Sequence, residues 1–68
     1  MTNKEIGETA GCVWRLLDGK KGNLTFDQIK KELKKVKKEE LYIAIGWLCR
    51  EDKLECCVKD EKETFCLK

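Results

Sequence analysis

The stretch that decides the fold reads Leu41-Tyr42-Ile43-Ala44-Ile45-Gly46-Trp47-Leu48-Cys49-Arg50-Glu51-Asp52-Lys53-Leu54. Its apolar residues recur at positions i, i+3, i+4 and i+7, which is the spacing of one helix face. These residues are Leu41, Ala44, Ile45 and Leu48. The polar run 50–53 then predicts the end of the helix, before Leu54 opens a strand. We therefore expect an amphipathic helix that leads directly into a β-strand.

A first helix is predicted upstream, over residues 3–18. Thr2 and Glu5 have the spacing of a capping box, in which the threonine oxygen accepts a hydrogen bond from the amide three residues later. Gly19 follows as a left-handed stop. The residues expected on the buried face of this helix are Ile6, Ala10, Val13 and Leu17.

A second helix is expected to begin at Thr25, because Thr25 and Gln28 repeat the capping-box pattern. Residues 23–24 before it are enough for a single strand bridge. The expected inward residues of this helix are Ile29 and Leu33, with Phe26 or Val36 closing the ends. The turn to the third helix is predicted at 35–38. It contains no glycine, and no Ser, Thr or Asp precedes the third helix as a cap.

The last fifteen or so residues alternate as strands do. Leu54, Cys56 and Val58 are expected on one face of the first strand, and Glu55, Cys57 and Lys59 on the other. Phe65 and Leu67 are expected on the apolar side of the second strand. A polar tip at 60–63 would pair Val58 with Phe65 and place Cys57 opposite Cys66.

The order helix, short strand, helix, helix, strand, strand predicts an α+β fold that is mostly α. We expect one domain over 1–68, with three helices and a small two- or three-stranded antiparallel sheet. Residues 8–11 and 44–54 resemble a family of small stand-alone prokaryotic winged helix-turn-helix proteins, largely uncharacterised, and the likeness spans essentially the whole chain. The resemblance implies a winged helix fold, and it suggests DNA binding only by analogy, because fold does not fix function.

Composition limits the functions available. A chain of 68 residues builds one small core and no deep substrate cavity. Charged residues make up 41% of it, yet the net charge is only +2, so the overall balance does not decide for or against nucleic acid. The start of the chain lacks the apolar run of a signal peptide. The uncharged run 41–49 is far shorter than the roughly 20 apolar residues of a membrane span. We expect a cytoplasmic protein with no membrane association.

Five cysteines stand in this chain without a C-x-x-C pair, and it has no histidine. A zinc site usually takes ligands at such paired spacing, so we expect no metal and no cofactor. The thiols are interpreted as reduced, small apolar side chains, with Cys57 and Cys66 free. With no histidine base and no glycine-rich phosphate loop, neither an enzyme activity nor a small-molecule substrate is expected.

The first candidate site is a lysine cluster on the second helix and the turn after it. Lysines in this part of a helix-turn-helix lie against the phosphate backbone of double-stranded DNA. The alternative is a solvated helix face that keeps a small protein soluble. The cluster consists of Lys30, Lys31, Lys34, Lys35, Lys37 and Lys38, with Lys59 and Lys62 assisting from the hairpin.

The second candidate is the outward face of the third helix, which carries Tyr42, Ile43, Gly46 and Trp47. These are not the hydrogen-bonding side chains that read base edges. An exposed Tyr, Ile and Trp together favour a protein partner or a homodimer. The alternative is that Tyr42 and Trp47 fold back and extend a thin core, as Trp14 is expected to do.

The leading interpretation is a regulatory protein that associates with nucleic acid through its lysines. The rival interpretation is a protein-interaction or homodimerisation module that uses Tyr42, Ile43 and Trp47 and does not bind DNA.

Overall fold

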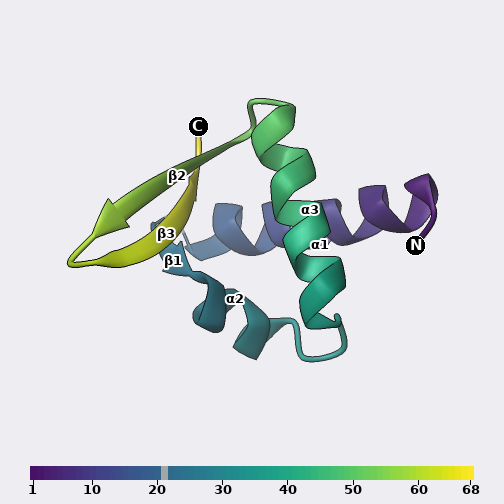
Figure 1. The fold of residues 1–68 in the computed structure, drawn as a ribbon, viewed down its shortest axis with the longest axis horizontal. Coiled ribbons are helices and arrows are strands. Elements are labelled where there is room, and N and C mark those ends of the chain that lie inside the picture. Colours follow the sequence, from purple (N-terminus) through teal and green to yellow (C-terminus); the bar gives the residue numbers. More distant parts are fainter. Residues whose placement is uncertain (21) are drawn as a thin grey trace.

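The computed structural model describes residues 1–20 and 22–68. In chain order the elements are α1 (Asn3–Lys20), β1 (Leu24–Thr25), α2 (Phe26–Glu32), α3 (Lys38–Arg50), β2 (Leu54–Lys59) and β3 (Lys62–Leu67). α3 crosses α1, α2 lies near the amino-terminal end of α3, and the β2–β3 hairpin projects to one side (Figure 1). The expected α+β class and element order are confirmed.

All three helices begin with a side chain that accepts a hydrogen bond from the backbone N–H of the cap residue. At α1, the Thr2 N–H donates to Glu5 Oε1 over 3.1 Å, and the Glu5 N–H donates back to Thr2 Oγ1 over 3.2 Å. The same exchange joins Thr25 and Gln28 at α2. At α3 only one of the two hydrogen bonds is present, in which the Lys37 N–H donates to Glu40 Oε1. Both predicted capping boxes are confirmed, and Glu40 supplies the acceptor where the sequence lacks a Ser, Thr or Asp cap.

The carboxyl end of α1 differs from expectation. The helix continues to Lys20, two residues beyond the predicted end. No glycine in the described ranges has a positive φ, so Gly19 is a helical residue and not a left-handed stop. Lys20 lies in the last turn, where a cation is favoured by the helix dipole, and its ammonium also pairs with Glu32.

The turn between α2 and α3 also starts earlier than predicted. α2 ends at Glu32, and residues 33–37 form the connection. Leu33 leaves the helical conformation, at φ −107° and ψ 61°, and its carbonyl accepts a hydrogen bond from the Val36 N–H. This tight turn allows both Leu33 and Val36 to pack against the core. Lys34 and Lys35 therefore belong to the turn and not to the helix.

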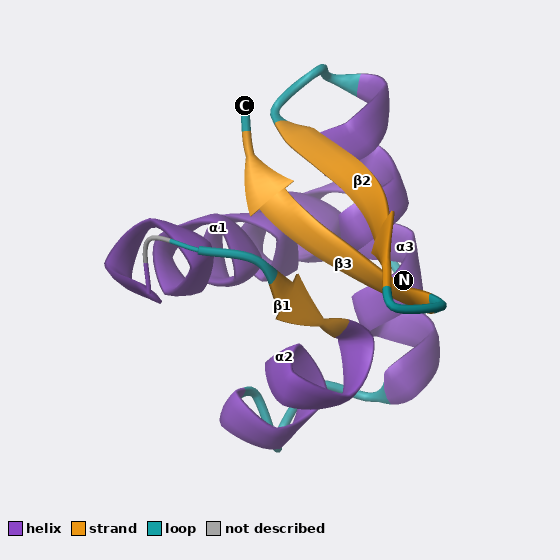
Figure 2. Ribbon diagram, turned by 90° about the vertical axis from the view of Figure 1, so that its left-hand side faces the viewer, coloured by secondary structure: helices purple, strands orange, loops and turns teal. Residues whose placement is uncertain are grey.

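The sheet has three antiparallel strands in the order β1-β3-β2, so β3 is central (Figure 2). The short strand is Leu24–Thr25, one residue later than the predicted bridge, and it pairs with Phe65 and Thr64. Asn23 secures this edge, because its Nδ2 donates to Thr64 Oγ1 over 3.1 Å.

The predicted register of the β2–β3 hairpin was wrong. Cys57 pairs with Thr64 and Val58 with Glu63, whereas Cys66 lies opposite Glu55. The cause is the turn, which has two residues instead of four. Asp60 and Glu61 both have positive φ, at 52° and 65°, as a type I′ turn requires. The slip is by two residues, so every side chain keeps the face that the alternation predicted.

The core lies where the helices meet the sheet. Val13, Ile29 and Leu41 are fully buried there, one from each helix, and Leu54 and Phe65 close it from the sheet. The buried apolar residues are Ala10, Val13, Leu17, Ile29, Leu41, Ala44, Ile45, Leu48, Leu54 and Phe65. The inward face predicted for α3 is confirmed. None of the described helices combines the length and apolarity that crossing a membrane requires.

Candidate nucleic-acid interface

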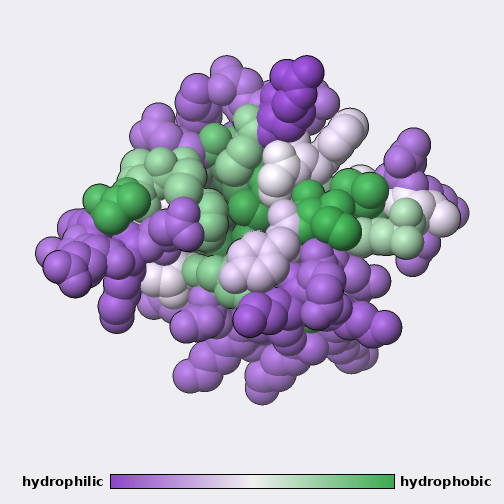
Figure 3. Space-filling model, in the orientation of Figure 1, coloured by the Kyte–Doolittle hydropathy of each residue, from purple (hydrophilic) through white to green (hydrophobic). Residues whose placement is uncertain are grey.

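The six clustered lysines all lie on α2, the following turn and the start of α3. Lys30 and Lys31 belong to the last turn of α2, Lys34 and Lys35 to the connection, and Lys37 and Lys38 to the amino-terminal end of α3. All except Lys30 are exposed. Hydrophilic side chains gather over this lower part of the molecule, beneath an apolar band (Figure 3). The lysines that the sequence placed in one cluster therefore share one region of the surface.

The charge of this cluster is poorly neutralised. Glu32 is the one acid within the run 30–38, and its carboxylate faces Lys20 of α1, at 3.8 Å, instead of a cluster lysine. The ammonium group of Lys30 already makes one hydrogen bond, because its Nζ donates to the Lys34 carbonyl over 3.5 Å. No ion pair involves the other cluster lysines within residues 1–20 and 22–68. Their ammonium groups are available to an anion.

The hairpin tip has a different electrostatic character. Lys59 and Lys62 pair across β2 and β3, and both are exposed. Asp60, Glu61 and Glu63 adjoin them, so two cations face three anions and the tip carries a net charge of −1. The structure does not join these two lysines to the α2–α3 cluster in one uniformly positive surface.

The outward face of α3 is apolar and exposed. Tyr42, Ile43 and Trp47 are 53%, 45% and 48% exposed. Tyr42 is held in place by Phe26 of α2, because the two rings stack at a centroid distance of 4.1 Å with an interplanar angle of 11°. Trp47 lines a shallow hollow with Asn3 and Ile6 of α1. Each ring thus lies beside a neighbouring helix, while about half of its surface remains in solvent.

The five cysteines occupy partly buried or exposed positions. All are free, and none belongs to the buried core; Cys49 and Cys56 are exposed. Cys57 and Cys66 are half-buried on the outer face of the sheet. The pKa of the Cys57 thiol is raised, first by desolvation and then by the hydrogen bond to the carboxylate of Glu55.

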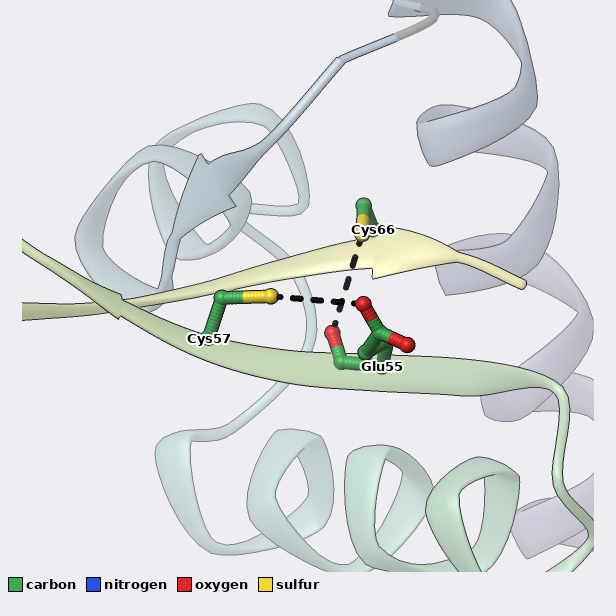
Figure 4. A group of neighbouring side chains, drawn as sticks. All are labelled: Glu55, Cys57 and Cys66. Atoms are coloured by element: carbon green, nitrogen blue, oxygen red, sulfur yellow. Dashed lines mark hydrogen bonds between the residues drawn. The ribbon is translucent and has the colours of Figure 1, made fainter.

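Glu55, Cys57 and Cys66 form a cluster that sequence reasoning missed (Figure 4). The Cys57 Sγ donates to Glu55 Oε1 over 3.6 Å, and the Cys66 Sγ lies 3.9 Å from the Glu55 carbonyl oxygen. The alternation already placed Glu55 and Cys57 on one face. What was missing was the register that brings Cys66 directly across from Glu55.

Three helices and a three-stranded antiparallel sheet, in this order along the chain, are the features of a winged helix-turn-helix domain. The family model described as "Winged helix-turn-helix domain (DUF2582)" matches residues 1–67, and the chain belongs to this family. It is also 42% identical over 66 residues to the uncharacterised protein MJ1608 of Methanocaldococcus jannaschii, covering 94% of this chain and 91% of that one.

Two solved structures share the fold. The solution structure of BT2368 from Bacteroides thetaiotaomicron superposes with a TM-score of 0.81 at 25% identity, over 98% of this chain and 79% of the other. A structure of HOP2, described for its DNA recognition and protein interaction domains, gives a TM-score of 0.78 at 16% identity. That match covers 88% of this chain and 98% of the HOP2 chain, and at this identity it shows the fold alone.

Proposed function

We propose that this protein associates with double-stranded DNA in a regulatory role, mainly through backbone phosphates held by the lysines between α2 and α3. The observation that carries the proposal is the exposure of Lys31, Lys34, Lys35, Lys37 and Lys38 in one region, with the nearby acid Glu32 directed to Lys20 instead. In a winged helix-turn-helix domain this region lies beside the phosphate backbone.

The chemistry of the interaction is counterion release. Each lysine that neutralises a phosphate displaces a condensed cation from the duplex, so affinity falls steeply as salt rises. The outward face of α3 adds little base readout, because Tyr42, Ile43 and Trp47 lack the paired donors and acceptors that distinguish base edges. The expected binding is therefore salt-sensitive and only weakly dependent on sequence.

The fold likeness to HOP2, which is described as having DNA recognition and protein interaction domains, supports both this proposal and its rival. The lysines favour DNA, because six cations gather on α2, the turn and the start of α3, and a bound anion relieves their mutual repulsion.

The test is a pair of variants with equal charge change. Lys34, Lys35 and Lys37 are replaced by glutamine in one, and Lys4, Arg15 and Lys53 in the other. Binding to a random-sequence duplex is followed by fluorescence anisotropy between about 50 and about 200 mM salt. The first variant is expected to bind more weakly, and its slope of log K against log salt should be shallower by about 0.9 for each phosphate that is no longer neutralised. The control variant is expected to retain most of both the affinity and the slope.

Equal losses of affinity in the two variants would show that only net charge matters, and an absence of binding at low salt would overturn the proposal. The second outcome would favour a protein partner on α3, where Ile43 and Trp47 remain about half exposed. Ile43→Ser is the cleanest probe of that alternative, because Tyr42 also stacks on Phe26 and its loss would disturb the fold. Sedimentation equilibrium of wild type and Ile43→Ser would reveal self-association through this face.

A further inference from the structure

We propose that Glu55, Cys57 and Cys66 form a binding site for a thiophilic divalent cation of the Zn²⁺ class on the outer face of the sheet. One ligand atom from each residue, two sulfurs and a carboxylate oxygen, lies within 4.8 Å of the other two. The residues come from paired strands and not from loops, so the backbone already fixes their relative positions. The inference is independent of nucleic-acid binding.

The spacing of these atoms suits tetrahedral coordination. With Zn–S of about 2.3 Å and Zn–O of about 2.1 Å, ligand atoms lie about 3.8 Å apart for sulfur and sulfur and about 3.6 Å for sulfur and oxygen. The Cys57 Sγ to Glu55 Oε1 distance is 3.6 Å, which already meets the second requirement. An ion would need only small side-chain adjustments, and the two strands would not have to separate.

A disulfide fits the same pair of cysteines less well. Cys57 pairs directly with Thr64, so Cys66 is its diagonal neighbour, two residues further along β3. Diagonal neighbours lie about 7–8 Å apart across a sheet, whereas disulfide-bonded cysteines usually have α-carbons about 4.4–6.8 Å apart. A bound cation spans the wider sulfur separation that this register leaves, so coordination is favoured over oxidation.

The ligand set also selects the type of ion. Two thiolates with one carboxylate favour a borderline or soft cation over Mg²⁺ or Ca²⁺, which prefer oxygen ligands alone. On binding, each thiol releases a proton to solvent and its thiolate coordinates the ion. Three protein ligands leave the fourth position to water. Such an ion would join β2 to β3 beside their hydrogen-bonded ladder.

The test uses Co²⁺ as a spectroscopic stand-in for Zn²⁺, with the protein kept reduced. Expected are one Co²⁺ bound per chain, thiolate-to-metal charge-transfer absorption, the visible bands of tetrahedral Co²⁺, and loss of all of these when Zn²⁺ is added. Cys57→Ser and Cys66→Ser should each abolish the charge-transfer pattern, and Glu55→Gln should weaken binding at least several-fold. The matched control replaces Cys49 and Cys56 with serine, which should leave the spectrum unchanged.

In the wild-type protein, Zn²⁺ should shift amide resonances mainly at 55–57 and 64–66, which makes the test independent of variant stability. Absence of charge-transfer absorption at millimolar Co²⁺ would overturn the proposal. A spectrum that survives Cys57→Ser but disappears in the Cys49, Cys56 control would overturn it as well. Circular dichroism of every variant confirms that each one compared is folded.

Discussion

Asp60 and Glu61 show how a single backbone conformation sets the geometry of the whole hairpin. Both have positive φ, a region that costs a residue other than glycine roughly 1–2 kcal/mol. Aspartate tolerates it better, because its short side chain can bond to the local backbone, whereas glutamate has no such advantage. The two-residue turn is kept because its twist matches that of the strands it joins.

Replacing Glu61 with glycine should therefore stabilise the protein. The free energy of unfolding is expected to rise by about 1 kcal/mol, because glycine adopts positive φ without steric strain. Urea unfolding followed by circular dichroism measures the change. Glu63→Gly is the matched control: Glu63 lies in β3, where glycine should cost about 0.5–1 kcal/mol. A loss of stability in Glu61→Gly would contradict the strain at the turn.

Glu5 gives the first helix a pH dependence. Its pKa is lowered mainly by the hydrogen bond from the Thr2 backbone N–H and next by that from the Thr2 hydroxyl. Because the folded pKa lies below the unfolded one, the stabilisation is complete above the unfolded pKa and is lost as pH falls through the folded pKa. NMR titration of the Glu5 carboxyl should show its pKa moving back towards the ordinary value in Thr2→Ala. The shift should be partial, because the variant keeps the backbone N–H, and an unchanged titration would show that the Thr2 hydroxyl has no such role.

At the scale of elements, one aromatic pair adds to the packing of α2 against α3. Phe26 follows the cap of α2 directly, and Tyr42 stands on the outward side of α3, so their stacking joins two helices that the basic turn separates. This stacking orients the lysines of the turn relative to α3. Without the stacking on Phe26, the turn between α2 and α3 would be held by one contact fewer.

A double-mutant cycle with Phe26→Leu and Tyr42→Leu should detect this pair. The coupling free energy is expected at about 0.5–1.5 kcal/mol, the usual range for stacked aromatic side chains. Ile43→Ser serves as the reference, since a surface change with no such partner should shift stability by no more than about 0.5 kcal/mol. A coupling indistinguishable from zero would mean that Tyr42 is held in place by α3 alone.

Elements whose signals are local could be predicted from the sequence. The Thr2–Glu5 and Thr25–Gln28 boxes, together with the apolar spacing of α3, depend on residues three or four positions apart, and the structure agrees with them. The hairpin register depends on a turn of two non-glycine residues. Without Asn-Gly or a similar signal at 60–61, nothing in the sequence distinguished that turn from a four-residue one.

The candidate sites likewise have features set by local sequence, which could be predicted, and features set by long-range packing, which could not. Lysines adjacent in sequence remain adjacent on the surface, so the cluster could be anticipated. The ion pair between Glu32 and Lys20 depends on how α1 packs against α2. The position of Cys66 opposite Glu55 depends on the register of the hairpin. Both are consequences of packing between residues far apart in the chain, which no local pattern records.

For the whole molecule, stability depends on the one small core formed where the helices meet the sheet. About 0.05–0.15 kcal/mol per residue suggests a total of about 3–10 kcal/mol for a chain of this length. Leu41→Ala removes a fully buried side chain and should cost about 2–5 kcal/mol. Thermal unfolding is expected to occur well below the wild-type midpoint, because this cost is a large fraction of the total. Val58→Ala, at a residue 73% exposed, should leave the midpoint nearly unchanged.

The central position of β3 also matters during synthesis. Leu24 of β1 pairs with Phe65, which is 41 residues later in the chain (65 − 24). At about 5–20 residues per second, a ribosome takes roughly 2–8 seconds to add that length. Throughout this interval the nascent chain holds β1 without its partner, whereas the helices, stabilised by interactions three and four residues apart, can form as they emerge. The sheet is therefore completed last, and it is the step at which a nascent chain of this protein is most open to mispairing.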